Sequence, residues 1–376
     1  MLQPIRYTDC LIRIPVKTAS RPYEVVIARG LLGRTSQVLN GLLPQPARLF
    51  VVTSKPIRKH WGEVLEKGLK GLKANYRVVE MPDGERAKRL AELEKLAERL
   101  VKHGADRHSV ILALGGGVVG DVGGFLASIY MRGLPVVQLP TTLLAQVDSA
   151  IGGKTGVNLR SGKNLLGAFH QPLSVVVDPD VLSTLPRREY RSGLFEAMKY
   201  GLIRNTKIFD TMEQRHEEVL KRDPELLEWL IAECIRVKAE VVSSDERESG
   251  ERRILNFGHT IGHALEAETG YKELLHGEAV GWGMIAAARI GEEAGVTDQL
   301  TSSRIRAVVN AYGPLPGFKF KPKSILRRLL SDKKTVGGIP HFVLAKSIGE
   351  VEIVSGVSER VVLRGLEDLR KLACLS

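Results

Sequence analysis

Three of the nine histidines lie within a short stretch of the segment 252–284, which reads RRILNFGHTIGHALEAETGYKELLHGEAVGWGM. Imidazole nitrogens are common zinc ligands, so this density predicts a metal site. His259 and His263 are four residues apart and would share one face of a helix, as an HxxxH zinc pair does. Thr260 follows His259 where HExxH zinc proteases have glutamate, so that protease class is not indicated.

A metal ion needs further ligands from other elements. His276 comes 17 residues after His259, opens a new helical pattern in HGEAVGWG, and can approach the same ion. Glu196, in RSGLFEAMKYG, is a candidate for the carboxylate ligand. From spacing alone, it stays open which histidines bind.

A glycine-rich loop forms a second candidate site. Gly115, Gly117 and Gly120 form GxGxxG after an apolar run and before a helical pattern, where backbone amides can receive a pyrophosphate. A tight turn would also explain these glycines. The loop follows about the third predicted strand, and no acidic residue stands ~20 residues later to bind a ribose. The loop PDGERAK at 82–88 follows another predicted strand, so a nucleotide across several strand ends fits better.

A polar, glycine-rich run extends from Arg132 to Asn164. Lys154 and Lys163 stand beside small residues in GGK and SGKN, which would let an ammonium group reach a bound anion. A solvated loop is the alternative for either lysine alone. The density of such residues favours an anionic ligand.

Apolar runs alternate with helical patterns between Leu49 and Asp178. This alternation is typical of a parallel sheet covered by helices on both faces. The predicted strands are LFVVTS, YRVVEM, SVILALGG, LPVVQLP and LSVVVD, and the predicted helices between them are 58–72, 88–103 and 120–131.

The second half has helical periodicity instead. We expect helices at 187–203, 224–245, 259–270, 276–295, 300–312 and 358–373, and a short hairpin within 335–355. Pro186 marks the boundary. The predicted fold is a doubly wound, Rossmann-like α/β domain over residues 1–185, followed by an all-α metal-binding domain over residues 186–376.

Composition limits the remaining functional classes. The 376 residues carry a net charge of +12, which suits nucleic acid or an anionic substrate. The basic residues are scattered and form no aromatic-interleaved stripe, so nucleic acid is not favoured. Three distant cysteines argue against a disulfide framework, and no signal peptide or membrane-spanning run is evident. We therefore expect a cytoplasmic protein without a membrane or nucleic-acid partner.

Taken together, these segments resemble the 3-dehydroquinate synthase family of sugar-phosphate cyclases. The resemblance covers roughly residues 80–345, in the family's order and spacing. Its motifs are GGGVVGD at 115–121, YMRG at 130–133, LPTTLLAQVDSAIGGKTGVN at 139–158, GKNLLGAFHQP at 162–172, FEAMKYG at 195–201, KAEVVSSDERE at 238–248, RILNFGHTIGHALE at 253–266 and LHGEAV at 275–280.

The resemblance implies an NAD⁺- and Zn²⁺- or Co²⁺-dependent carbon–oxygen lyase that works as a homodimer, with an active site between its domains. The substrate would be 3-deoxy-D-arabino-heptulosonate 7-phosphate, a phosphorylated sugar acid of the shikimate pathway. Glu196, His259 and His276 would hold the metal, and His263 would be an active-site residue rather than a ligand. NAD⁺ contacts would come from Asp83, Glu85, Lys88, Gly116, Gly117, Asp121, Thr141, Thr142, Lys154 and Lys163.

The family also implies two anion pockets for this substrate. Lys154, Asn164, Asn256 and His263 would lie near its phosphate, with Arg132 reaching over from the partner subunit. Lys238 and Arg252 would bind its carboxylate, with Lys199 close by, and Asp148 would lie near nicotinamide and substrate. A further active-site lysine would be Lys333 or Lys334.

Two positions depart from the family pattern. Ser54 stands where an aspartate often contacts the adenosine ribose, and Phe195 replaces a usual small residue. The alternatives are another sugar-phosphate cyclase, such as 2-deoxy-scyllo-inosose or 2-epi-5-epi-valiolone synthase, and an iron-type or glycerol dehydrogenase. Lys238, Arg252 and Asn256 suit a carboxylate-bearing substrate and favour dehydroquinate synthase. The dehydrogenases lack the GKN and KAEVV…DERE cationic set.

Overall fold

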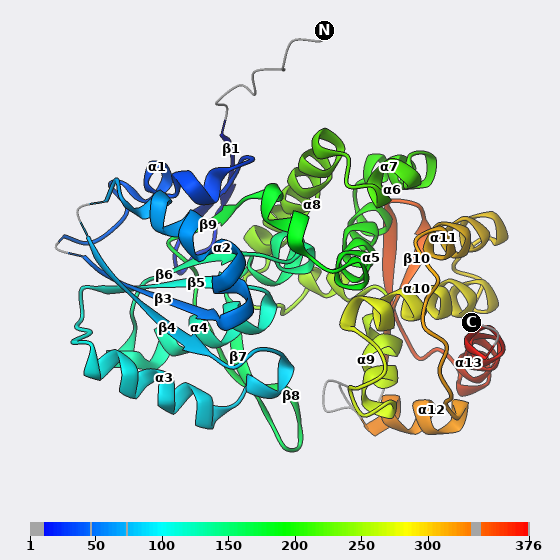
Figure 1. Cartoon of the computed structure of the whole chain (residues 1–376). Coiled ribbons are helices and arrows are strands. Elements are labelled where there is room, and N and C mark those ends of the chain that lie inside the picture. Colours follow the sequence, from blue (N-terminus) through cyan, green and yellow to red (C-terminus); the bar gives the residue numbers. More distant parts are fainter. Residues whose placement is uncertain (1–10, 46, 73, 332–339, 375–376) are drawn as a thin grey trace, which may run out of the picture. The chain divides into compact units, whose positions relative to one another are not determined.

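The computed structural model describes residues 11–45, 47–72, 74–331 and 340–374, which form two compact units (Figure 1). Unit 1 comprises the described residues within 11–141 and 149–184, and unit 2 comprises those within 142–148 and 185–374. The sequence assigned 142–148 to the first domain, whereas these residues pack with the second. A Cβ on Gly193 would lie 2.7 Å from Leu143 Cβ, so glycine there allows this approach.

Unit 1 contains a seven-stranded sheet in the order β1-β2-β9-β6-β5-β3-β4. β1 pairs antiparallel with β2, and all other pairs are parallel. The strands are β1 (Ile12–Val16), β2 (Tyr23–Ile27), β3 (Arg48–Ser54), β4 (Asn75–Met81), β5 (Ser109–Gly115), β6 (Val136–Pro140) and β9 (Ser174–Val177). The five predicted strands are confirmed, and the sequence analysis missed β1 and β2.

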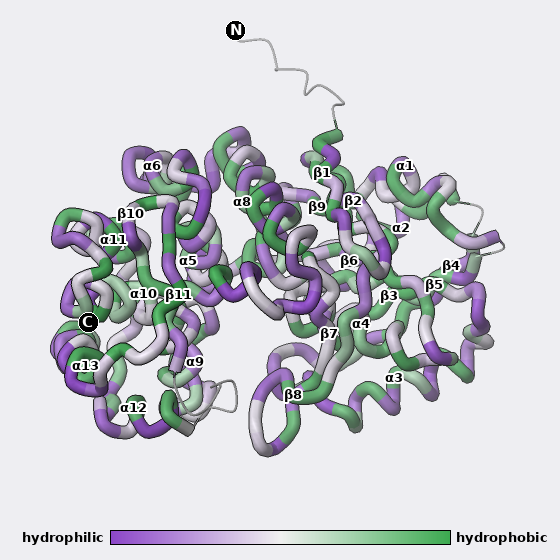
Figure 2. The backbone as a smooth tube through the Cα atoms, turned by 180° about the vertical axis from the view of Figure 1, so that it is seen from behind, coloured by the Kyte–Doolittle hydropathy of each residue, from purple (hydrophilic) through white to green (hydrophobic). Residues whose placement is uncertain are grey.

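Helices cover both faces of this sheet, as expected for a doubly wound fold. Figure 2 shows the central strands largely in the colours of hydrophobic residues. On one face, Phe50 and Ile111 of the strands pack with Leu96 and Phe125 of α3 and α4 in a buried core. The helical elements are η1 (Leu31–Arg34), α1 (Ser36–Leu39), α2 (Lys55–Leu69), η2 (Glu85–Ala87), α3 (Leu90–Lys102), α4 (Gly117–Ile129), η3 (Tyr130–Arg132) and η5 (Pro179–Thr184).

The polar, glycine-rich run forms regular structure instead of an irregular loop. β7 (Lys154–Leu159) and β8 (Gly162–Phe169) pair as an antiparallel hairpin in which Lys154 opposes Phe169. The Cβ of a residue at 156 or 167 would collide with the facing backbone, so glycines hold the two strands at close range. Glycine-rich composition concealed this hairpin because glycine is rare in strands.

Unit 2 is mostly helical, as predicted. The expected hairpin is confirmed in β10 (His341–Ser347) and β11 (Glu350–Ser355), which pair antiparallel. The sequence analysis missed α6, α7 and α12. The helical elements are η4 (Ala145–Ser149, a π-turn that ends in unit 1), α5 (Arg187–Ile203), α6 (Thr206–Gln214), α7 (His216–Leu220), α8 (Pro224–Ser244), η6 (Glu251–Asn256), α9 (His259–Glu268), α10 (His276–Glu293), α11 (Gln299–Ala311), α12 (Pro322–Ser331) and α13 (Glu359–Ala373).

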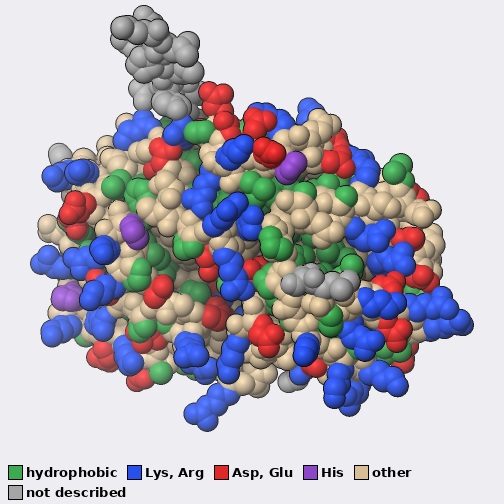
Figure 3. All heavy atoms as spheres, turned by 45° about the vertical axis from the view of Figure 1, so that its right-hand side comes forward, with side chains coloured by type: hydrophobic (Ala, Val, Ile, Leu, Met, Phe, Trp, Pro, Cys, Tyr) green, Lys and Arg blue, Asp and Glu red, His purple; other side chains and the backbone are tan. Residues whose placement is uncertain are grey.

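The distribution of surface charge and the lengths of the helices bear on nucleic-acid binding and on membrane spanning. Figure 3 shows Lys and Arg side chains spread over the visible face and interspersed with Asp and Glu, without a continuous basic stripe. Among the described helices, none combines the length and hydropathy that a membrane crossing requires.

Candidate metal and substrate site

Two imidazole rings converge on one buried carboxylate in unit 2. Oε1 of Glu196 lies 3.2 Å from Nε2 of His259 and 3.3 Å from Nε2 of His276. The Glu196 side chain is fully buried, and neither carboxylate oxygen accepts a hydrogen bond of good geometry. Ligand atoms that share one Zn²⁺ at tetrahedral angles lie about 3.3 Å apart. Each Nε2 therefore stands at the spacing from the Glu196 oxygen that two ligands of one ion would have.

The remaining ring nitrogens explain why a cation fits there. Nδ1 of His259 lies 3.1 Å from the carbonyl oxygen of Phe257, which can only accept a hydrogen bond. Nδ1 therefore carries the proton, and in a neutral ring Nε2 presents a lone pair to the Glu196 oxygen. Two acceptors at 3.2 Å repel each other unless a proton or a metal ion lies between them. Burial lowers the pKa of His259, which disfavours a proton between these two atoms.

His276 is held by a second carboxylate. Its Nδ1 lies 3.1 Å from Oε2 of Glu266, on the side of the ring away from Glu196. Burial lowers the pKa of His276, but Glu196 and Glu266 outweigh that effect and raise the pKa to about 10. The negative charge that favours a proton on this ring also favours a metal cation beside it.

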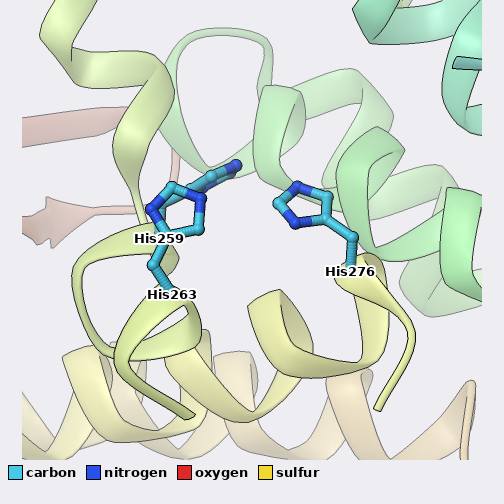
Figure 4. A group of neighbouring side chains, drawn as sticks. All are labelled: His259, His263 and His276. Atoms are coloured by element: carbon cyan, nitrogen blue, oxygen red, sulfur yellow. The ribbon is translucent and has the colours of Figure 1, made fainter. Parts of the chain in front are cut away.

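His263 belongs to the same cluster. Figure 4 shows the three imidazole rings turned towards one another, with His259 and His263 on one helix and His276 on the next. Their candidate ligand atoms all lie within 4.8 Å of one another. The His263 ring centroid lies 5.3 Å from that of His259.

Close helix packing fixes these rings. A Cβ on Gly283 of α10 would lie 1.9 Å from the carbonyl oxygen of Gly258, so glycine is required where the start of α9 meets α10. Gly258 has φ +77°, a left-handed conformation that favours glycine. At the start of α10, the Glu278 carboxylate accepts from Leu275 N and pairs with Arg188. These contacts hold His259 and His276 on adjoining helix starts.

A buried charge cluster adjoins Glu196. Oδ1 of Asp148 accepts from Lys238 Nζ at 2.7 Å and from the Tyr200 hydroxyl at 2.6 Å. Nζ of Lys199 lies 3.6 Å from the same oxygen and 2.6 Å from Oε2 of Glu196. Lys199 thus links Asp148 to the Glu196 carboxylate.

Burial and charge shift the pKa values in this cluster. Burial raises the pKa of Asp148, but Lys238 and Lys199 outweigh it and hold that pKa far below its usual value. Burial lowers the pKa of Lys238 to about 8 in spite of Asp148. For Lys199, burial lowers the pKa, but Glu196 and Asp148 raise it overall. Lys199 therefore stays charged at neutral pH, whereas Lys238 titrates close to it.

The loop after α8 supplies a further buried cation. Arg252 is 1% exposed, and its guanidinium donates to the carbonyl oxygen of Glu246. The Asp245 carboxylate closes this loop by accepting from Gly250 N at 2.7 Å and Arg252 N at 3.1 Å. Asn256 donates to Glu248 at 2.9 Å. The predicted substrate residues Arg252 and Asn256 are thus fixed by a short acidic loop.

Unit 1 carries the predicted nucleotide residues at the carboxyl end of its sheet. Across the sheet, the chain moves from β3 to β4 towards one edge and from β5 to β6 towards the other edge. The strand order therefore reverses between β3 and β5. Open α/β sheets bind ligands at such a reversal. Gly116 precedes α4, which begins there at Gly117 without a side-chain cap, so its first amides can receive a phosphate. Ser54, at the end of β3, donates to Asp83 at 3.0 Å.

A polar network joins the loop after β4 to the β7–β8 hairpin within unit 1. The buried Lys88 ammonium contacts the Asp121 carboxylate and the side-chain oxygen of Asn164. Glu85 accepts from Asn158 at 2.7 Å and lies 4.0 Å from Lys163 Nζ. The structure therefore brings Glu85, Lys88, Asp121, Lys163 and Asn164 together.

The remaining predicted residues stand at other positions in the chain or outside the described residues. Thr141 follows β6 and donates its amide to the carbonyl of Gly115, and Thr142 begins the segment that packs with unit 2. Lys154 is exposed at the start of β7, and Arg132 is exposed with φ 69°. Lys333 and Lys334 lie outside the described residues.

The sequence analysis gave no role to Tyr200 and Glu266. Both are buried and contact a predicted site residue, Asp148 and His276 respectively. Tyr200 directly follows Lys199 in FEAMKYG, so its position in a motif was the available signal. Glu266 ends the motif HTIGHALE, but nothing in its spacing indicates a contact with His276.

Comparison with known proteins agrees with this arrangement. The family model "3-dehydroquinate synthase N-terminal" matches residues 78–192, and "3-dehydroquinate synthase C-terminal" matches residues 193–335. The 3-dehydroquinate synthase of Koribacter versatilis is 54% identical over 361 residues, which cover 96% of this chain and 99% of the relative. Five further relatives with 41 to 53% identity carry the same name.

Solved structures of two other cyclases are also similar. The 2-epi-5-epi-valiolone synthase of Streptomyces hygroscopicus, solved with NAD⁺ and Zn²⁺, has a TM-score of 0.85 and 30% identity, with 93% of this chain and 97% of that chain covered. A 2-deoxy-scyllo-inosose synthase, solved with carbaglucose-6-phosphate, NAD⁺ and Co²⁺, has a TM-score of 0.81 and 28% identity, with 96% and 99% covered. Both family models and the closely similar relatives point to one conclusion: the chain belongs to the 3-dehydroquinate synthase family.

Proposed function

We propose that this protein converts 3-deoxy-D-arabino-heptulosonate 7-phosphate into 3-dehydroquinate and phosphate, the reaction of its family in the shikimate pathway. It would act as a carbon–oxygen lyase. The observation that carries the proposal is the convergence of His259 and His276 on the Glu196 carboxylate beside a buried pair of lysines. The 54% identity to a dehydroquinate synthase, against 30% and 28% to the two other cyclases, favours this substrate.

Glu196, His259 and His276 would hold Zn²⁺ or Co²⁺, and the carboxyl end of the unit 1 sheet would bind NAD⁺. When bound, the metal lowers the pKa of the reacting hydroxyl, and NAD⁺ takes up a hydride and later returns it. Temporary oxidation of that hydroxyl to a ketone makes the proton on the neighbouring carbon acidic. Loss of this proton then allows phosphate to be eliminated. The final step closes the carbocycle by an aldol reaction.

The chain's own residues would position the substrate. Lys238 and Arg252 are buried cations and would bind its carboxylate, because an unpaired anion in a dry site is costly. Asp148 holds Lys238 by a short ion pair, and Lys199 links Asp148 to Glu196. Within unit 2, Asn256 and His263 would serve the phosphate end.

We also propose that the protein is a homodimer in which Arg132 contributes to the partner's phosphate site. Arg132 is exposed and lies in a segment where Met131, Arg132 and Gly133 all have positive φ, so the backbone presents the side chain in a fixed, unusual conformation. Sedimentation of the wild type, and phosphate release by Arg132→Ala, test this point. A monomer with full activity would refute it.

The central experiment is a turnover assay with purified protein, NAD⁺ and Zn²⁺ or Co²⁺. We expect phosphate release from the heptulosonate, formation of dehydroquinate identified by mass, and no accumulation of NADH. A phosphosugar that lacks the carboxylate serves as the control substrate and should react poorly. NADH that accumulated in proportion to substrate would instead indicate a dehydrogenase, and a rate unaffected by a chelator would exclude the metal role.

A further inference from the structure

Glu266 is a buried acid that the proposed reaction does not use. It lies in the last turn of α9 and is 3% exposed. Its Oε2 lies 3.1 Å from Nδ1 of His276. A carboxylate is seldom buried unless it is paired, so the contact with His276 accounts for the burial of Glu266. The function of this buried pair remains to be explained.

The position of Glu266 excludes a role as a fourth ligand of the same ion. It contacts Nδ1 of His276, whereas Nε2 of that ring faces Oε1 of Glu196 at 3.3 Å. The two nitrogens point away from each other, so the imidazole ring separates Glu266 from the ligand atoms. Glu266 can act on the metal only through His276.

Such a contact changes a histidine ligand in two ways. The carboxylate accepts the Nδ1 proton, which fixes the tautomer with a lone pair on Nε2 and holds the ring orientation. Its negative charge also makes the imidazole a stronger donor to a metal. His276 needs this support more than His259, because its side chain is 33% exposed and that of His259 only 9%.

The local structure holds Glu266 in place. The α9 helix ends two residues after it, at Glu268, and the carbonyl of Glu266 accepts from Tyr271 N at 2.7 Å and from the hydroxyl of Thr269. Gly270 has φ +63°, as is usual at the end of a helix. The carboxylate is therefore presented from a fixed helix terminus and not from a loop.

We propose that Glu266 is a positioning residue for the metal, which orients His276 and strengthens its bond to the ion. This inference rests on the proposed metal site of Glu196, His259 and His276. It assigns a function to a residue that touches neither substrate nor metal. Loss of a carboxylate partner of this kind typically weakens metal binding by about 10- to 100-fold.

The test compares Glu266→Gln with Glu268→Gln. Glu268 lies on the same helix, but its carboxylate accepts from Ser324 and Arg328 on α12. Both variants remove one negative charge from α9, so long-range electrostatic effects are matched. Zn²⁺ and Co²⁺ affinities are measured by competition with a chelating indicator. We expect about a 10- to 100-fold loss for Glu266→Gln and little change for Glu268→Gln.

Two further measurements separate positioning from general damage. Activity of Glu266→Gln should fall at limiting metal and recover at saturating metal, while its thermal unfolding after chelation should match that of Glu268→Gln. If Glu266→Gln does not fold, Glu266→Asp decides the question, because it keeps the charge but withdraws it by one methylene. Weaker Co²⁺ binding with an altered absorption spectrum would support the proposal.

Unchanged affinity in Glu266→Gln, or an unchanged affinity and spectrum in Glu266→Asp, would overturn the proposal. An equal loss in Glu268→Gln would do the same, because it would show a general effect of charge. His276→Ala distinguishes this failure from failure of the metal site itself. If His276→Ala loses the ion but Glu266→Gln does not, the site stands and only the role of Glu266 is wrong.

Discussion

The replacement Asp148→Asn tests the electrostatics of the substrate site. Asp148 lies 2.7 Å from Lys238, whose pKa burial already lowers to about 8. Asparagine keeps the shape and can still accept from Tyr200, but it removes the negative charge. An opposite charge at this distance typically raises the pKa of an ammonium group by about 1–3 units. Loss of the Asp148 charge should therefore lower the pKa of Lys238 to roughly 5–7.

The consequence is a shift in the pH dependence of substrate binding. Lys238 must be protonated to hold the substrate carboxylate, so kcat/KM of the wild type should decline above about pH 8. In Asp148→Asn, this decline should begin near roughly pH 5–7. At pH 7.5 the variant should therefore lose about 4- to 300-fold relative to its own acidic plateau, because only the protonated fraction of Lys238 binds the carboxylate.

The sign for stability is opposite to that for binding. The folded pKa of Lys238 lies below its unfolded value of 10.5, so the unfolded chain holds more protons between pH 8 and 10.5. The free energy of unfolding therefore gains from this group as the pH rises through that window. Substrate binding is lost over the same rise, so the two measurements identify the same lysine independently.

The assay is phosphate release across pH 5.5–9, at several substrate concentrations, with Asp210→Asn as the control. Asp210 pairs with Arg304 within the same unit and lies partly exposed. A lower plateau in Asp148→Asn is expected whatever the pH, because Asp148 also adjoins Lys199. The reasoning would be refuted if the basic decline stayed near pH 8 in Asp148→Asn.

Three further predictions test other parts of the structure. His276→Ala should lose the metal, whereas His263→Ala should keep it and impair turnover; equal metal loss in both, by metal analysis after dialysis, would contradict the assignment. Gly283→Ala should place a Cβ 1.9 Å from the Gly258 carbonyl oxygen, so we expect the protein to be destabilised by about 3 kcal/mol or more and to bind metal more weakly. Urea unfolding and metal competition measure the two effects. The control is Gly33→Ala, whose Cβ would meet Val64 at 3.6 Å. Lys88→Met should destabilise unit 1 by about 3–5 kcal/mol, since it removes the buried partner of Asp121, and should weaken NAD⁺ binding in calorimetry; unchanged NAD⁺ affinity would exclude Lys88 from that site.

The parallel sheet was predictable because its central strands are short and almost wholly apolar. β5 is buried at every residue, so its sequence SVILALG carries a clear signal. The edge strand β1 is exposed at alternate positions and includes Pro15, which weakens the strand pattern. The hairpin of β7 and β8 depends on glycines that let two backbones approach, and this requirement is invisible in a propensity pattern.

The helical unit was predictable where amphipathic periodicity is long. Helix α5 was predicted over its full observed range, 187–203, and α10 to within two residues. The short helices α6 and α7 were missed, since nine and five residues give too little periodicity to separate from a loop. Residues 142–148 pack with unit 2 through contacts with α5. Their position in the chain, between segments of unit 1, could not reveal this packing.

The metal cluster shows what spacing alone cannot decide. An interval of four residues pairs His259 with His263 on one helix face, and their rings do lie 5.3 Å apart. Which nitrogens face a common oxygen depends instead on partners at the far side of each ring. The Phe257 carbonyl takes Nδ1 of His259 and the Glu266 carboxylate takes Nδ1 of His276, so that both Nε2 atoms meet Glu196. A backbone carbonyl leaves no signal in the sequence, and a glutamate in a helix is most often a solvated residue. The selection of ligands from three clustered histidines is therefore a property of the folded arrangement, and a search for metal sites by histidine spacing would choose the wrong pair if the proposed assignment holds.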